Sequence, residues 1–407
     1  MFISQRKCPI CNSNKNLFIK NIKFSLFEGH PMQGGYDLIQ CKICSFIYAD
    51  TKVTQTELDE YYSNLSKYEN KEISTGGGYS DYDRNRLIDT AEYISKVFDD
   101  KKIEIADVGC ASGGLLEQLR KEGFNNITGI DPSISCVNIT KYEKGINCFN
   151  SSLFNLDKTF GKYDLLILSH VWEHILDLEA ALNSIKKILK PDGYIYVECP
   201  NAMNYKNLIH SPYQEFNTEH INHFSFSSLN NFFAKRGFDI KENGTKIMKI
   251  ASGGDYDAVY GLYRKVREKS NYEIKFDIEI LPSIKEYIKL SDKMYLKLIN
   301  QIKSITALNQ NIALIGIGQL AFKILYTIKE LKIKNKIFLF DSNILYEGKK
   351  IINTKIFSSR NIVSNYKNEK FNVIITSMIY QNEISKYIEN EFKKNNLEIP
   401  HIFKLGK

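Results

Sequence analysis

The segment IEIADVGCASGGLLEQLRKEG (103–123) constrains the fold of this chain more than any other. An apolar run over 103–108 predicts a strand, and the apolar spacing after Gly114 predicts a helix, so a glycine loop joins the two. Glycines let the backbone pass close beneath a ligand, and the first helical turn offers free N–H groups. Asp131 ends the next predicted strand, where a carboxylate can accept both hydroxyls of a ribose. The alternative is an ordinary tight turn; strand, helix and aspartate together favour a nucleotide-type cofactor.

The same alternation of strand and helix patterns continues from about residue 83 to 265. Short apolar runs predict strands at YDLLILS (163–169) and YIYVECP (194–200), with a helical pattern between them. Strands that alternate with helices predict an α/β, Rossmann-like domain whose parallel sheet is covered on both faces. A long helical pattern follows over 283–305, and a second strand–helix unit opens at NIALIGIGQLAF (311–322). We therefore expect a second Rossmann-like domain.

Four cysteines form two C-x2-C pairs separated by 29 residues, Cys8 with Cys11 and Cys41 with Cys44. In a reducing compartment such pairs more often bind metal than form disulfides. Two knuckles of this spacing can hold Zn²⁺ tetrahedrally, and four sulfurs leave no open position, so the predicted zinc is structural. The alternative is four unrelated free thiols.

These patterns divide the chain into four expected segments. The glycine-rich stretch STGGGYSDYDRNR (74–86) is interpreted as a flexible connection after the cysteine-rich part. The expected segments are a zinc-binding domain over 1–70, the first α/β domain over 71–265, a helical linker over 266–305 and the second Rossmann-like domain over 306–407.

Size and charge exclude some classes of function. The 407 residues suffice for two or three domains, and the net charge of +8 is spread without a dense basic block, which argues against nucleic acid. No apolar run approaches the roughly 20 residues that span a bilayer. The N-terminal MFISQRKCPIC lacks the apolar region of a signal peptide. We expect a cytoplasmic monomer or small homo-oligomer with a small-molecule substrate, bound to neither nucleic acid nor membrane.

The segment FNTEHINHFSFSS (216–228) places Glu219, His220 and His223 within five positions, in a chain with seven histidines. Such a cluster can hold a metal, move a proton or satisfy a buried turn. It follows a predicted strand, at the edge where open α/β sheets bind ligands. Because the cysteines already provide a closed zinc site, we predict an acid–base role for Glu219 and His220, with His223 as orienting partner or rival.

The segment HVWEH (170–174) is a competing cluster just past a predicted strand. Its alternative interpretation is a helix start around a buried Trp172. His170 and His174 have a spacing that can bind metal, but the sequence offers no evident third ligand.

The loop DVGCASGG resembles the first motif of class I S-adenosylmethionine-dependent methyltransferases. The segment from YDLLILSHVWEH to KPDGYIYVECPN resembles the fourth strand, adjoining helix and fifth strand of that family. The resemblance implies S-adenosylmethionine as cofactor, with Asp107, Gly109, Ala111 and Gly113 lining its methionine and ribose. It further implies that Asp131 holds the ribose hydroxyls, that Ser152 and Leu153 flank the adenine, and that Ser169 and His170 face cofactor or substrate.

The order of cysteine knuckle, methyltransferase domain and C-terminal Rossmann-like domain resembles three-domain sugar C-methyltransferases. That resemblance implies a nucleotide-linked keto-deoxysugar substrate, methylated at carbon after a base removes a proton next to the ketone. It puts Glu219 and His220 at the active site, with the histidine favoured as base. The sequence departs from that family in two ways. The tyrosine that usually precedes the Glu-His pair is absent, with Asn217 near its place, and His223 is an additional histidine. O-methylation of a sugar or small metabolite is the second candidate.

Two further features have two interpretations each. Tyr79 and Tyr82 are either donors that reach the active site or aromatic residues that pack at a domain seam. The C-terminal IGIGQLA, with Asp341 ending the next predicted strand, has the pattern of a dinucleotide site. The resemblance implies instead a domain that completes the substrate site, so an appended NAD-dependent oxidoreductase is the less favoured alternative.

Overall fold

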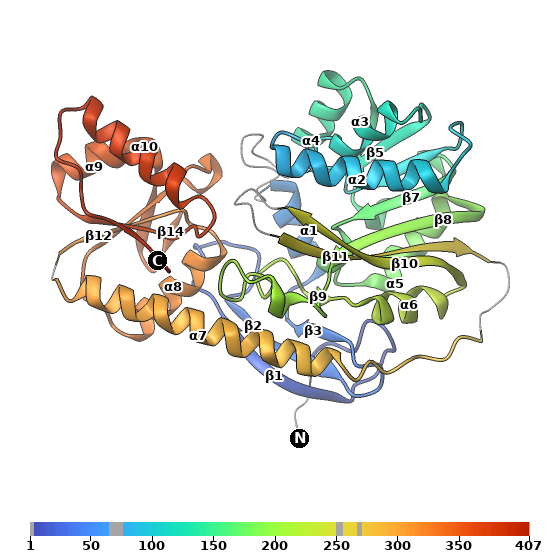
Figure 1. Ribbon diagram of the computed structural model, residues 1–407, viewed down its shortest axis with the longest axis horizontal. Helices are drawn as coiled ribbons and strands as arrows, with labels where there is room; N and C mark the ends of the chain where they lie inside the picture. Colours follow the sequence, from blue (N-terminus) through green and yellow to red (C-terminus); the bar gives the residue numbers. More distant parts are fainter. Residues whose placement is uncertain (1–3, 65–75, 250–254, 267–270, 309, 407) are drawn as a thin grey trace. The chain divides into compact units, whose positions relative to one another are not determined.

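The computed structural model describes residues 4–64, 76–249, 255–266, 271–308 and 310–406 (Figure 1). The chain divides into two compact units. The first comprises Met1–Lys20, Asp37–Leu208 and Glu219–Lys285; the second comprises Asn21–Tyr36, Ile209–Thr218 and Glu286–Lys407.

A seven-stranded sheet forms the centre of the first unit, in the order β10-β11-β8-β7-β4-β5-β6. Its strands are β4 (Ile105–Val108), β5 (Ile127–Asp131), β6 (Asn147–Asn150), β7 (Tyr163–Ser169), β8 (Leu189–Pro200), β10 (Phe238–Lys249) and β11 (Asp255–Lys265). The pairs from β6 to β8 are parallel, and β11 runs antiparallel to both of its neighbours. The chain order reverses between β4 and β7, and doubly wound sheets bind ligands outside the carboxyl ends of the strands at such a point.

Alternate residues of the central strands supply two separate cores. Ala106 and Leu166 face a core that helices α5 (Leu178–Ile188) and α6 (Phe226–Ala234) cover. Ile105 and Leu165 face the other core, under α2 (Asp81–Val97) and α3 (Gly114–Lys121). Figure 1 shows the sheet between these helix layers. The two-residue period explains why the strands are apolar throughout: both faces are buried.

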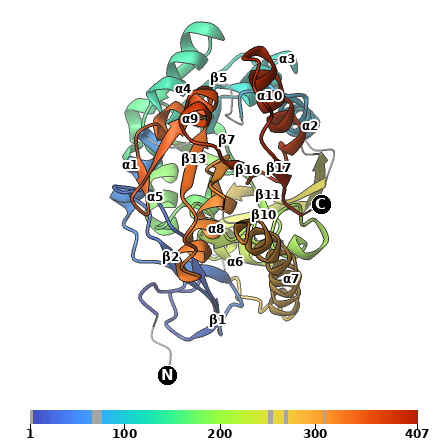
Figure 2. The same cartoon turned by 90° about the vertical axis from the view of Figure 1, so that its left-hand side faces the viewer.

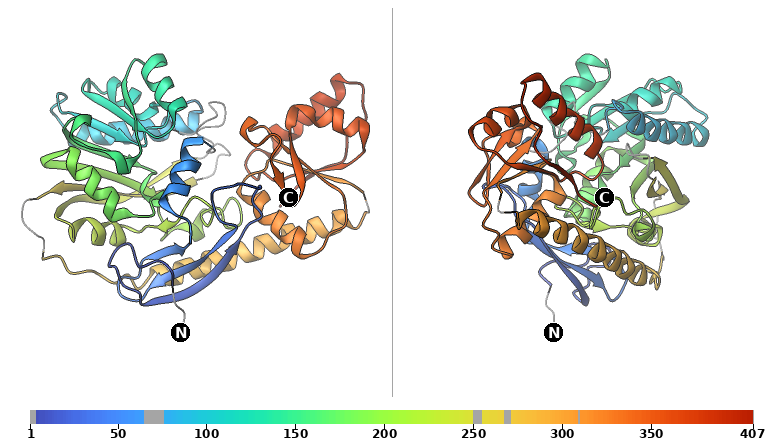
Figure 3. Two further views of the ribbon diagram at one scale, coloured as in Figure 1. Left: turned by 180° about the vertical axis from the view of Figure 1, so that it is seen from behind. Right: turned by 60° about the vertical axis from the view of Figure 1, so that its left-hand side comes forward.

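A four-stranded sheet, β1-β2-β3-β9, carries the cysteine pairs. Its strands are β1 (Asn16–Lys23), β2 (Gly35–Cys41), β3 (Ile47–Asp50) and β9 (Asn222–His223); the first three are drawn in blue in Figure 3. The pairing of β3 with β9 joins the start of the chain to the segment after β8. Helix α1 (Gln55–Asn64) follows β3.

The second unit holds a six-stranded sheet in the order β14-β15-β13-β12-β16-β17, parallel except for β14. Its strands are β12 (Ile312–Ile315), β13 (Ile337–Asp341), β14 (Lys350–Ile351), β15 (Thr354–Ser358), β16 (Asn372–Ile375) and β17 (Ile402–Lys404). Its helices are α7 (Ile280–Thr306, whose first residues belong to the first unit), α8 (Gln319–Glu330), α9 (Ile362–Asn368) and α10 (Gln381–Lys394). Apolar side chains of α9 and α10 cover one face of this sheet (Figure 2).

The predicted α/β Rossmann-like architecture is confirmed in both units, including the long helix after residue 280. The interpretation of 74–86 as a flexible connection is wrong for residues 81–86, which belong to helix α2. Residues 74 and 75 lie outside the described part, but helix α2 begins at Asp81. The Ser80 side chain caps it, and Asp83 accepts hydrogen bonds from Gly76 N and Gly78 N, each at 2.8 Å. The glycines at 76–78 suggest a loop, but Ser80 followed by acidic residues is the pattern of a helix N-terminus.

Among the helices that the structure describes, none is both long and apolar enough to cross a bilayer.

Candidate active site

The glycine loop after β4 has the geometry of a close backbone cradle. Gly109 and Gly113 have φ values of 80° and 74°, which side chains rarely adopt. A Cβ on Gly109 would come within 2.5 Å of Val171, and one on Gly113 within 2.8 Å of Thr140. Gly113 is the N-cap of α3, so the loop delivers the chain directly into a helix. Only glycine fits at these two positions.

Two buried carboxylates, Asp107 and Asp131, lie beneath this loop. Asp131 Oδ2 accepts from Ala111 N at 2.9 Å, and its Oδ1 accepts from Ser133 N at 2.9 Å. Asp107 is 3% exposed, and burial together with the charge of Asp131 raises its pKa to about 7, against the opposing charge of Arg86. A pair of carboxylates held like this favours a ligand with positive charge and hydroxyl groups.

Two buried hydroxyls in the same region, Ser112 Oγ and Ser152 Oγ, have no hydrogen-bond partner among the described residues. Ser112 belongs to the glycine loop, and Ser152 precedes a 3-10 turn that begins at the buried Leu153. Buried hydroxyls without partners are uncommon and suit a polar ligand. With the glycine cradle and the carboxylates, they fit an adenosine-type cofactor that carries a cationic group.

The end of β7 concentrates charge at the point where the strand order reverses. Ser169 ends the strand, and His170 follows with a left-handed backbone (φ 56°), a conformation that clusters at functional sites. The His170 ring lies between two buried carboxylates: Nδ1 is 3.3 Å from Glu173 Oε1, and Nε2 is 3.2 Å from Glu198 Oε1. Burial opposes protonation of His170, but these two carboxylates raise its pKa on balance.

Glu198 on β8 is fully buried, and its carboxylate contacts several donor groups. Tyr196 OH donates to its Oε2 at 2.7 Å, and Lys246 Nζ lies 2.5 Å from the same oxygen. Burial alone would raise the pKa of Glu198, but Lys246 and His170 lower it well below its usual range. This network links the strand ends of β7 and β8 to β10.

One backbone hydrogen bond and one hydrogen bond from the His174 ring hold the segment that carries Glu219 and His220 against the turn η5 (Trp172–His174). Ile221 N donates to Glu173 O at 3.0 Å, and His174 Nδ1 donates to Glu219 O at 3.0 Å. The rings of His174 and His220 are 5.0 Å apart. The structure thus brings HVWEH and FNTEHINHFSFSS, separate in sequence, into one cluster.

Helix α1 adds two tyrosines to this cluster that sequence reasoning missed. Tyr61 OH donates to Glu219 Oε1 at 2.9 Å, and Tyr62 OH lies 2.9 Å from His174 Nδ1. Tyr61 and Tyr62 are adjacent aromatics of a short helix more than 100 residues upstream of η5. Two adjacent tyrosines form no known motif, so the sequence alone does not predict that they contact Glu219 and His174.

The remaining candidates occupy different surroundings. His223 is 1% exposed within β9, with Nδ1 3.4 Å from Tyr205 OH, and burial lowers its pKa to about 3. Tyr79 is 40% exposed just before α2, and Lys144 Nζ lies 5.8 Å from its ring centre. Trp172 is fully buried, as the helix-start interpretation of HVWEH expected.

The four cysteines of the two knuckles converge as predicted. Cys8 Sγ is 3.4 Å from Cys44 Sγ, Cys11 Sγ is 3.4 Å from Cys41 Sγ, and all four sulfurs lie within 4.8 Å of one another. Zn–S bonds of about 2.3 Å place sulfurs about 3.8 Å apart, so the cluster is a candidate tetrahedral zinc site. No disulfide links them.

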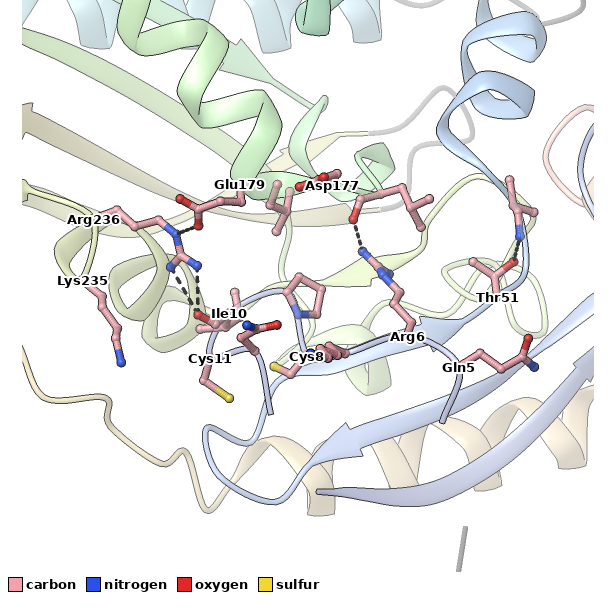
Figure 4. Close-up of a pocket in the computed structure, with 16 residues that line it drawn as sticks. Gln5, Arg6, Cys8, Ile10, Cys11, Thr51, Asp177, Glu179, Lys235 and Arg236 are labelled. Carbon is pink, nitrogen blue, oxygen red and sulfur yellow. Dashed lines mark hydrogen bonds and ion pairs between the residues drawn. The ribbon is translucent and has the colours of Figure 1, made fainter. Parts of the chain in front are cut away.

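Two arginines, Arg6 and Arg236, connect this cysteine cluster to helix α5 and to the loop before it, beside a hollow of about 670 Å³. Arg236 bridges Glu179 Oε2 at 2.5 Å and Ile10 O at 3.2 Å, as Figure 4 shows. Arg6 donates to Leu176 O at 2.7 Å and Asn222 Oδ1 at 3.0 Å. The knuckle therefore packs as part of the first unit.

A family model described as a methyltransferase domain matches residues 79–243. The match covers the glycine loop, β4 to β8 and the segment with Glu219 and His220. Residues 79–243 are thus similar to a methyltransferase domain, and the predicted methyltransferase-like α/β fold is confirmed for this part.

Two curated relatives match about a quarter of the chain. The mitochondrial ubiquinone biosynthesis O-methyltransferase of Bos taurus is 32% identical over 108 residues, which are 24% of this chain and 29% of that protein. The enzyme of the same name from Rickettsia conorii (strain ATCC VR-613 / Malish 7) is 33% identical over 116 residues, 27% of this chain and 39% of that protein. The chain thus spans about a third of the length of these relatives.

Solved structures are similar at lower identity. Coclaurine N-methyltransferase bound to N-methylheliamine and S-adenosylhomocysteine is 15% identical, with a TM-score of 0.37 over 52% of this chain and 82% of that one. The magnesium protoporphyrin IX methyltransferase of Synechocystis PCC 6803 with bound S-adenosylmethionine is 14% identical, with a TM-score of 0.34 over 52% and 91%. Scores this low support no further comparison.

Proposed function

We propose that this protein is an S-adenosylmethionine-dependent methyltransferase that methylates a small molecule, with a nucleotide-linked keto-deoxysugar as first candidate. The observation that carries the proposal is the pairing of two features in the first unit. A glycine cradle over buried carboxylates follows β4, and an imidazole, His220, is braced against the turn that follows β7. One feature suits a cationic nucleoside and the other suits proton transfer.

The cofactor role rests on the fit of the loop residues. S-adenosylmethionine supplies a methyl group that its sulfonium already activates. Asp131 ends β5 and accepts hydrogen bonds from Ala111 N and Ser133 N, and we assign the ribose hydroxyls to its carboxylate because it ends the strand that follows the glycine loop. The remaining residues proposed to line the cofactor are Asp107, Gly109, Gly113, Ser152, Leu153, Ser169 and His170.

In the proposed reaction, His220 is the base that removes a proton from the acceptor. For carbon, that proton lies next to a ketone and leaves an enolate; for oxygen, it is a hydroxyl proton. Glu219 next to it accepts the hydrogen bond of Tyr61, which orients the carboxylate without neutralising it. One carboxylate oxygen of Glu173 lies within 4.8 Å of a ring nitrogen of His220, so a second buried carboxylate lies beside the proposed base.

Carbon methylation of a nucleotide-linked sugar is the first candidate because the chain carries more than the methyltransferase domain. The cysteine cluster and the second Rossmann-like unit lie outside the family match, and their order is that of the sugar C-methyltransferases that the sequence resembles. Oxygen methylation is the second candidate, because the curated relatives named above are O-methyltransferases.

The test is incubation with nucleotide-linked keto-sugars in heavy water, with and without S-adenosylmethionine, followed by NMR of the sugar. Carbon methylation predicts a new C–CH3 signal and deuterium exchange at the acceptor carbon that His220→Ala abolishes. An O–CH3 signal would move the assignment to oxygen. Absence of any methylated product across keto-sugars and phenolic acceptors, with cofactor bound, would contradict the proposal.

A further inference from the structure

We propose that Glu173, His174 and His220 form a second metal site, separate from the cysteine cluster, for a divalent ion of borderline softness such as Zn²⁺ or Co²⁺. One ligand atom of each residue lies within 4.8 Å of the other two. Two imidazoles and one carboxylate suit such ions, and three protein ligands leave coordination positions open. The spacing of His170 and His174 offers no third ligand, whereas the folded chain brings His174 together with Glu173 and His220.

The hydrogen bonding of His174 at Nδ1 leaves its other ring nitrogen, Nε2, to bind a metal ion. Glu219 O is a carbonyl and can only accept, whereas Tyr62 OH can accept or donate, so the His174 tautomer with its proton on Nδ1 is the one that satisfies the contacts with both oxygens, at 3.0 Å and 2.9 Å. The lone pair is then on Nε2, which lies 3.9 Å from Glu173 Oε1. An imidazole whose far N–H bonds a backbone carbonyl is the usual arrangement of a metal-binding histidine.

The backbone fixes His220 at the same point. Its two neighbours are tied to the other two ligands: Glu219 O accepts from His174, and Ile221 N donates to Glu173 O at 3.0 Å. Asn222 strengthens this brace, since its Nδ2 donates to Ile175 O at 2.7 Å. These hydrogen bonds therefore hold the two segments that carry Glu173, His174 and His220 against each other.

Charge and distance also fit. Glu173 is 1% exposed, so an anion here needs cationic neighbours, and a divalent ion would supply that charge. Bonds of about 2.0–2.1 Å at tetrahedral angles separate ligand atoms by about 3.3 Å. The pair at 3.9 Å needs to close by about half an ångström, which side-chain rotation allows.

If the proposed function is correct, a metal ion bound at this site affects the ability of His220 to act as a base. A ligated His220 nitrogen has no lone pair for a proton, so the ion and the base role exclude each other. An ion in this site should therefore inhibit methyl transfer.

The test is to produce the full chain in medium with Co²⁺ in place of Zn²⁺ and to combine elemental analysis with absorption spectra. Thiolate ligands give intense near-ultraviolet charge-transfer bands, whereas a histidine–carboxylate site gives only weak visible bands. We expect two cobalt ions per chain in the wild type. Glu173→Gln and His220→Ala should each lose one ion and keep the thiolate bands, which also report an intact fold. The exposed His401 provides the matched control, and His401→Ala should keep both ions.

One cobalt per chain in the wild type, or a second ion that survives both Glu173→Gln and His220→Ala, would overturn the site. The number of cobalt ions per chain is measured without an enzyme assay, so this result does not depend on whether the proposed reaction is correct. If the second ion is present and raises the rate of methyl transfer, mutual exclusion is wrong and His220 is not the base.

Discussion

Replacing Asp107 by asparagine should stabilise the cofactor-free protein above neutral pH and have little effect near pH 4. Asp107 is buried in β4, and burial, with the charge of Asp131 added, raises its pKa from 3.8 to about 7. A carboxylic acid whose folded pKa exceeds the unfolded value destabilises the fold once it ionises. That cost begins as the pH rises above about 4 and is complete above about 7.

The size of the effect follows from the difference between the two pKa values. At 1.36 kcal/mol per pKa unit, ionised Asp107 costs on the order of 4 kcal/mol at pH 8 and about 1.5 kcal/mol at pH 5. Asp107→Asn removes the charge with little change in volume. The difference in unfolding free energy between variant and wild type should therefore grow by roughly 4 kcal/mol between pH 4 and pH 8.

The assay is urea unfolding followed by tryptophan fluorescence at several pH values. Trp172 is the only tryptophan of the chain and is fully buried in the first unit, so its emission reports on that unit alone. The control is Asp239→Asn, at an exposed position of β10, whose effect should not vary with pH. A difference for Asp107→Asn that stays constant from pH 4 to pH 8 would refute the reasoning.

Cofactor binding should reverse this penalty, since a cationic ligand beside Asp107 lowers its pKa. Near pH 7, where Asp107 is about half protonated, binding should release about half a proton per cofactor. Titration calorimetry in buffers of different ionisation enthalpy measures this release, and Asp107→Asn should abolish it.

Three further predictions concern the active-site cluster and the cysteines. His220→Ala should lower turnover by about 100- to 10,000-fold and leave binding of S-adenosylhomocysteine nearly unchanged; a larger loss with His223→Ala would assign the base to the other histidine. Tyr61→Phe removes the 2.9 Å hydrogen bond to Glu219 and should lower kcat about tenfold without changing cofactor affinity, and an unchanged kcat would show that this bond does not orient the site. Cys11→Ser should release the structural zinc and lower the Tm, whereas Cys136→Ser, outside the cluster, should keep it; equal zinc content in both variants would contradict the assignment.

The fold was predictable because each element has a local signal. Apolar runs gave β4, β5, β7 and β8, and helical spacing gave α3 and α5, since strands buried on both faces have few polar residues. The start of α2 was missed because glycines preceding it suggested a loop, although Ser80 and the acidic residues after it form a helix cap.

The candidate site was predictable only in part. The glycine loop and Asp131 lie within one strand–helix–strand segment, so sequence spacing predicts their convergence. Tyr61 reaches Glu219 from a helix 158 residues away, and His174 meets His220 through backbone hydrogen bonds that no spacing encodes. Tertiary pairing, here of β3 with β9, brings these segments together.

The most direct test of the account is binding of S-adenosylhomocysteine and of NAD to the full chain, measured by thermal shift and titration calorimetry. The account predicts one S-adenosylhomocysteine per chain, with a raised Tm and affinity lost in Asp131→Ala. Stabilisation by NAD alone, with no binding of S-adenosylhomocysteine, would contradict it.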